Sequence, residues 1–133
     1  MFDYQKIQIQ KYPKNIDKII SSSIFRDDNY FLYVFKKAER ILAALYMMTN
    51  YFDIDEPAKV HIRTCGLDFL SLSIKISQQS SFSKDESVKA MAKILLELTS
   101  IFEISFLSGM VSEMNHAILR REFDSLLEIV ISL

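Results

Sequence analysis

The sequence predicts an all-α protein, an antiparallel up-down four-helix bundle with a short N-terminal arm or helix. Three observations lead to this prediction. Proline and glycine each occur only twice in 133 residues, and Pro57 and Gly109 separate stretches of similar length. Within those stretches, apolar residues recur at the three- and four-residue spacing of one helix face. Half of the residues are apolar, which suits a single buried core over residues 1–133.

Residues 1–26 are expected to form the arm and the short helix. Polar and apolar residues alternate over residues 6–10, a pattern typical of an extended chain that is too short to make a sheet alone. Pro13 suits a first helical turn, and isoleucines follow it at helical spacing. We therefore expect a short helix over about residues 13–22.

The first bundle helix is expected over residues 27–52. Asp27, Asp28 and Asn29 offer side-chain oxygens that cap free amides at a helix start, where the helix dipole also favours negative charge. The apolar residues that follow at helical spacing form its core face: Phe31, Val34, Phe35, Ala38, Ile41, Leu42, Leu45, Met48 and Phe52.

The second helix is expected over residues 57–81. Pro57 fits a first helical position, where its missing amide hydrogen is no loss. The connection before it is short, which makes the first two helices antiparallel neighbours. Gly66 lies inside this helix, where it costs about 1 kcal/mol relative to alanine. We expect it to mark close packing against another backbone.

The remaining chain is interpreted as two helices, over residues 84–109 and 112–132. Gly109 suits the left-handed conformation that ends a helix, and Ser112 or Asn115 can cap the next one. The alternative is one continuous helix of about 70 Å in a swapped dimer, because a monomer would leave half of its apolar stripe uncovered.

The third helix is expected to start at a capping box formed by Ser83 and Glu86. Apolar side chains of this helix occupy most of its circumference, which indicates burial on more than one face. Self-association is the more frequent cause of such surface, and a groove for a partner helix is the alternative. The residues expected at the interface are Ile94, Leu96, Ile101, Ile104 and Leu107.

Charge is balanced, with 16 Lys and Arg against 17 Asp and Glu and a formal net charge of −1. A basic surface for nucleic acid must therefore be local. Cations on the first and fourth helices would form one strip able to contact RNA phosphates if those helices are neighbours. The residues of this strip are Lys36, Lys37, Arg40, Arg120 and Arg121. The alternative is a solvated face of cations paired with carboxylates, which the net charge favours.

We expect no catalytic residue, no metal site and no cofactor. His61 and His116 lie on different helices, and Glu97 and Glu103 do not share a helix face, so the inward carboxylate and histidine set of a metal-binding bundle is missing. His61 and Cys65 are spaced to touch, but the sequence indicates no third group to orient them. Burial as a small apolar residue is the favoured interpretation of Cys65.

Several segments resemble small uncharacterised helical proteins of candidate-phyla bacteria. The segments are YFLYVFKKAER at residues 30–40, EP at 56–57, Arg63 and MNHAILRREF at 114–123. Size and expected topology also resemble the accessory variability protein of diversity-generating retroelements, a four-helix bundle that oligomerises into a ring. The second resemblance implies a subunit that helps a reverse transcriptase handle RNA.

The expected function is a non-enzymatic, homo-oligomeric assembly or adaptor subunit. The alternative is a nucleic-acid-associated accessory subunit of the reverse transcriptase of a diversity-generating retroelement. Expected partners are the chain itself, another protein and RNA, but not a membrane, because Glu97 and Glu103 interrupt the most apolar stretch at about 2.5 kcal/mol or more each. The single cysteine and the absence of a secretory signal favour the cytoplasm.

Overall fold

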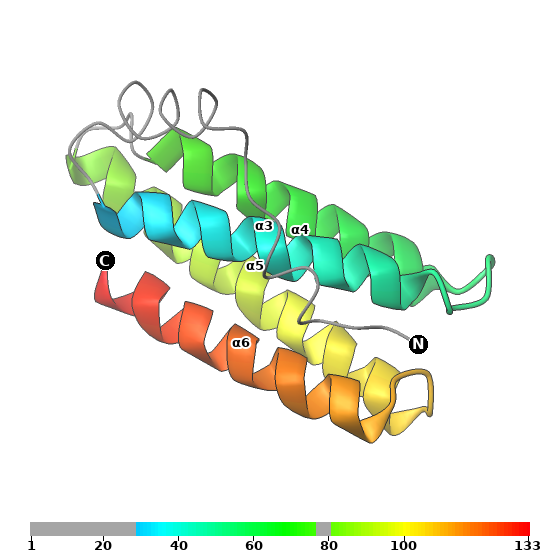
Figure 1. The fold of residues 1–133 in the computed structure, drawn as a ribbon. Coiled ribbons are helices and arrows are strands. Elements are labelled where there is room, and N and C mark those ends of the chain that lie inside the picture. Colours follow the sequence, from blue (N-terminus) through cyan, green and yellow to red (C-terminus); the bar gives the residue numbers. More distant parts are fainter. Residues whose placement is uncertain (1–28, 77–80) are drawn as a thin grey trace, which may run out of the picture.

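The computed structural model describes residues 29–76 and 81–133, and this part of the chain is all-helical, without a strand. It contains α3 (Asn29–Thr49), α4 (Pro57–Ile76), α5 (Ser81–Leu107) and α6 (Glu113–Ser132). Consecutive helices pack against each other, and α6 also packs against α3, which closes the bundle (Figure 1). The predicted all-α four-helix bundle is confirmed. The expected arm and short helix lie outside the described residues.

The apolar faces of the four helices meet in one core. Every residue of the stripe expected on the first bundle helix is buried. Phe102 of α5 and Phe123 of α6 are fully buried and meet edge to face, with 5.3 Å between their ring centroids. This geometry favours aromatic pairs beyond the area they bury. Buried residues of all four helices belong to this one core.

Helix ends agree with the sequence-based expectations only in part. Pro57 is the first residue of α4, as predicted. α3 ends at Thr49, before residue 52, because the amide of Phe52 bonds to the Thr49 carbonyl in a turn. α5 begins at Ser81, so the second helix cannot extend to residue 81, and Ser83 lies inside α5. The capping box is therefore wrong as a start site of this helix.

The C-terminal end of α3 is held by Arg63 of α4. Its Nε donates to Thr49 Oγ1 at 2.9 Å, and its Nη2 donates to the Tyr46 carbonyl at 3.1 Å and to Asn50 Oδ1 at 2.8 Å. The guanidinium carbon also lies 4.5 Å from the centroid of the Tyr46 ring. The Tyr46 carbonyl also accepts from the Asn50 amide, so Arg63 adds a further donor to the last turn of α3 and ties that turn to α4.

The turn between α5 and α6 ends one helix and starts the next. Gly109 has a φ of +87°, its amide bonds to the Phe106 carbonyl at 3.0 Å, and the Met110 amide bonds to the Ser105 carbonyl at 2.9 Å. This is a Schellman motif with glycine in its left-handed position. Ser112 caps α6 and accepts a hydrogen bond from the Asn115 amide. The predicted break at Gly109 is confirmed, and the continuous helix is wrong.

Gly66 marks a close approach between α3 and α4. A Cβ atom at this position would overlap Cδ1 of Leu42 on α3. The predicted close packing is confirmed, but the neighbour is a side chain and not a backbone. Any residue larger than glycine requires Leu42 to move within the core.

Candidate functional site

A row of exposed residues runs along the outer face of α4. Val60, Leu67 and Ile74 are between 38% and 66% exposed, and Thr64 and Ser71 lie exposed between them. Their spacing alternates four and three residues, which keeps all five on one side of the helix, as in a coiled-coil seam. We call these five residues the α4 row. The sequence places Leu67 and Ile74 on a flank of the core stripe of this helix, but their seven-residue repeat with Val60 was not recognised, because the core stripe has similar spacing.

The residues expected at an interface on α5 divide into two groups. Leu96, Ile104 and Leu107 are 60% to 75% exposed, and we call them the α5 row. Ile94 and Ile101 are partly buried and pack against the core. Ile94 and Ile101 therefore serve the bundle itself, and of these five residues only the three of the α5 row are largely exposed. Its use as an interface stays a prediction.

The cations of α3 do not share one environment. Lys37 is buried, and its Nζ lies 2.7 Å from Glu122 Oε2 of α6 and 5.8 Å from the centroid of the Tyr33 ring. Its ammonium group is thus held inside the bundle and not presented to a phosphate. Lys36 and Arg40 are partly exposed. The prediction that Lys37 belongs to a basic strip on the surface is therefore wrong, because its side chain is buried.

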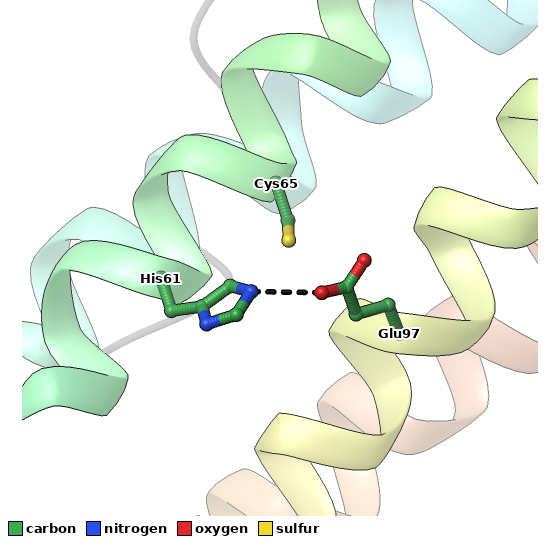
Figure 2. Close-up of side chains that lie close together, drawn as sticks. All are labelled: His61, Cys65 and Glu97. Carbon is green, nitrogen blue, oxygen red and sulfur yellow. Dashed lines mark hydrogen bonds and ion pairs between the residues drawn. The ribbon is translucent and has the colours of Figure 1, made fainter.

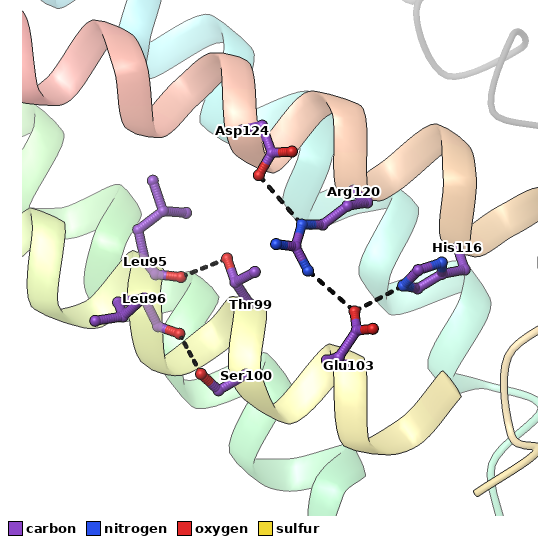
Figure 3. A network of polar contacts seen from close by, with 8 residues as sticks. All are labelled: Leu95, Leu96, Thr99, Ser100, Glu103, His116, Arg120 and Asp124. Carbon is purple, nitrogen blue, oxygen red and sulfur yellow. Dashed lines mark hydrogen bonds and ion pairs between the residues drawn. The ribbon is translucent and has the colours of Figure 1, made fainter. Parts of the chain in front are cut away.

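The two cations of α6 do not form a strip with those of α3. Arg120 donates from Nη1 to Glu103 Oε2 of α5 at 3.0 Å and from Nε to Asp124 Oδ1 at 3.2 Å (Figure 3). Glu122, two residues further on, lies about 200° around the helix and faces α3. Arg120 therefore faces α5 and does not join the α3 cations in one strip. Arg121 is exposed.

Glu103 is the centre of a polar network between α5 and α6. His116 Nε2 lies 2.7 Å from Glu103 Oε2 (Figure 3). The His116 ring also stacks on Phe106, with 3.8 Å between the ring centroids. The hydrogen bond with His116 is the main reason that the pKa of Glu103 lies below its ordinary value, and the charge of Arg120 lowers it further. The network is well satisfied, so we assign it a structural role.

Three side chains that can bind a metal converge between α4 and α5. His61 and Cys65 lie one helical turn apart on α4, and Glu97 reaches toward them from α5 (Figure 2). His61 Nε2 is 2.8 Å from Glu97 Oε1, and the ligand atoms of all three residues lie within 4.8 Å of one another. We call these residues the His61–Cys65–Glu97 cluster. His61 and Glu97 are exposed, whereas Cys65 is buried.

Glu97 is the third group that sequence reasoning did not find beside His61 and Cys65. The expectation that Glu97 and Glu103 do not share a face is confirmed, because Glu97 contacts α4 and Glu103 contacts α6. No local pattern indicates which neighbour each carboxylate meets. To predict the cluster from the sequence, one would need to know which side of α5 faces α4.

The cluster is poorly suited to nucleophilic catalysis by Cys65 alone. Burial raises the pKa of the Cys65 thiol, and the carboxylates of Glu97 and Asp68 raise it further. The thiol therefore stays protonated near neutral pH, whereas a nucleophilic cysteine needs the thiolate. The arrangement suits ligation better than catalysis.

Comparison with protein-family models, with curated proteins and with solved structures finds no match to this chain. The two resemblances seen in the sequence therefore stay predictions. Within residues 29–76 and 81–133, no helix is both long and apolar enough to cross a membrane.

Proposed function

We propose that this chain is a non-enzymatic assembly or adaptor subunit that associates with copies of itself through the α4 row and the α5 row. The observation that supports the proposal is the α4 row, in which Val60, Leu67 and Ile74 are 66%, 46% and 38% exposed at seven-residue intervals. Seven-residue apolar spacing is the pattern that pairs helices in coiled coils. An apolar row outside an already complete core favours a partner.

A second copy of the chain is the partner that this surface fits best. The α4 row can pair with itself, because its five side chains carry no charge and two copies related by a twofold axis bring the same side chains together. The net charge of −1 adds little repulsion between copies. Leu67 is the middle of the row, so an antiparallel pair of α4 helices would be centred on it. The proposal includes a cytoplasmic location, which the single cysteine favours.

The test is the mass of the full chain in solution, measured by light scattering after size-exclusion chromatography over a range of concentrations. We expect an oligomer for the wild type and a shift toward monomer for Leu67→Glu. Ile104→Glu tests the α5 row in the same way. Ile131→Glu is the matched control, because Ile131 is an exposed residue of α6 outside both rows. A wild-type monomer at every concentration would refute the proposal.

RNA binding as an accessory subunit stays the second prediction, and no contact among the described residues favours it. Its test is the affinity for single-stranded RNA at increasing salt concentration. Binding through phosphates weakens as salt rises, with a slope set by the number of contacts. Absence of binding at low salt would end this alternative.

A further inference from the structure

We propose that His61, Cys65 and Glu97 bind a divalent transition metal ion, with Zn²⁺ the best match, between α4 and α5. The three residues supply an imidazole nitrogen, a thiolate sulfur and a carboxylate oxygen, which are the three ligand types that Zn²⁺ takes in proteins. They come from two helices whose packing is fixed by the core. The cluster is distinct from both apolar rows and does not depend on self-association.

The positions of the ligand atoms fit a tetrahedral ion after small side-chain movements. Bond lengths of about 2.0–2.3 Å to Zn²⁺ place tetrahedral ligand atoms about 3.4 Å apart. In the structure the ligand atoms lie within 4.8 Å of one another, and His61 Nε2 and Glu97 Oε1 are 2.8 Å apart. An ion between them would replace their hydrogen bond. Rotations that move these tips by about 1 Å are sufficient.

Access and charge both suit a bound dication. The side chains of His61 and Glu97 are 52% and 54% exposed, so an ion can enter from solvent, while the buried Cys65 provides the inner ligand (Figure 2). On binding, the Cys65 thiol releases its proton to solvent, and its thiolate and the Glu97 carboxylate together balance the two charges of the ion. The sulfur ligand favours Zn²⁺ over Mg²⁺ and Ca²⁺, which prefer oxygen.

Three protein ligands leave a fourth tetrahedral position open. In zinc proteins, an open position of this kind holds water or an exchangeable ligand, and structural zinc sites are usually closed by four protein ligands. The geometry therefore points to an exchangeable or regulatory site.

A second His–Glu pair in the same bundle provides a matched control. His116 and Glu103 are 2.7 Å apart, about as close as His61 and Glu97. Arg120 occupies the position next to that pair, where its positive charge repels a cation. The two pairs thus differ in the third group, which is a thiol in one and a guanidinium in the other.

The experiment is a titration of the full, metal-stripped chain with Co²⁺, which takes the geometry of Zn²⁺ and gives absorption bands that report its ligands. We expect a thiolate-to-cobalt charge-transfer band and the visible bands of a tetrahedral ion, saturating at one Co²⁺ per chain and lost when Zn²⁺ is added. Cys65→Ala should abolish the charge-transfer band. Glu97→Gln and His61→Gln should each weaken binding at least about tenfold, and His116→Gln should leave it unchanged.

Two outcomes would overturn the proposal. One is wild-type protein that shows no charge-transfer band with Co²⁺. The other is equal Zn²⁺ affinity, measured by calorimetry, for the wild type and Glu97→Gln. Glu97 is exposed, so this variant keeps the core intact and gives a clear result even if replacing the buried Cys65 disturbs folding. Circular dichroism of each variant before titration establishes that it is folded.

Discussion

Replacing Glu122 with leucine is expected to lower the free energy of unfolding by about 3 kcal/mol. Lys37 Nζ lies 2.7 Å from Glu122 Oε2, and their side chains are 9% and 22% exposed. Removal of the carboxylate leaves an ammonium group in the protein interior without its counter-charge. Breaking a fully buried pair costs about 3–5 kcal/mol, and the lower end applies because Glu122 keeps some contact with water. For a chain of this size, the loss corresponds to a fall of about 12 °C in Tm.

The assay is urea denaturation followed by circular dichroism for the wild type, Glu122→Leu, Lys37→Met and the double variant. The double variant should return to within about 1 kcal/mol of the wild type, because two apolar side chains can replace a buried ion pair. Asp124→Ala is the control, since it removes the exposed pair with Arg120 and should cost about 0.5 kcal/mol or less. A loss below about 1 kcal/mol in Glu122→Leu, or a double variant no more stable than it, would refute this reasoning.

Three further perturbations test the turns, the helix cap and the polar network. Gly109→Ala should cost about 1–2 kcal/mol in urea denaturation because φ is +87° and no atom obstructs the new Cβ; an unchanged midpoint would contradict the left-handed turn. Arg63→Lys should cost about 1–2 kcal/mol, since one ammonium cannot reproduce the bonds to Thr49, Tyr46 and Asn50; stability equal to the wild type would count against the cap. The lowered pKa of Glu103 means that its ionised form stabilises the fold above about pH 4.3 and that this contribution disappears as pH falls through the folded-state pKa. Thermal unfolding of Glu103→Gln should therefore differ from the wild type near neutral pH and converge with it in acid, and a difference that does not depend on pH would oppose this assignment.

The features that the sequence predicts well have causes within a few residues. Pro57 starts α4 because of its own ring, and Gly109 ends α5 because glycine tolerates a positive φ. Apolar spacing likewise identified the buried stripe of α3, since a helix turns by a constant angle per residue. Ser83 is the exception, because α5 begins at Ser81, two residues before the start that its capping preference predicts.

The features that the sequence did not predict depend on residues far apart in the chain. Lys37 resembles its partly exposed neighbour Lys36 in sequence, and its ion pair with Glu122, 85 residues away, makes its burial tolerable. Similarly, Glu97 joins His61 and Cys65 only through the orientation of α5 against α4. Helical periodicity gives the angle between residues of one helix, but it does not give the angle between two helices. The candidate metal site could therefore be recognised only from the three-dimensional structure.

The order of the helices also determines how the bundle assembles in time. α3 with α4, α4 with α5, and α5 with α6 are neighbours in sequence, so their contacts join segments that are close together in the chain. Contacts between α3 and α6 instead join the first and the last described helices. Because closing a long loop is entropically costly, we expect the α3–α6 contacts to form after the folding transition state. Breaking the link between Lys37 and Glu122 should then mainly accelerate unfolding and hardly slow folding. The unfolding rate, and with it the lifetime of the folded protein, would accordingly depend on the contacts between α3 and α6.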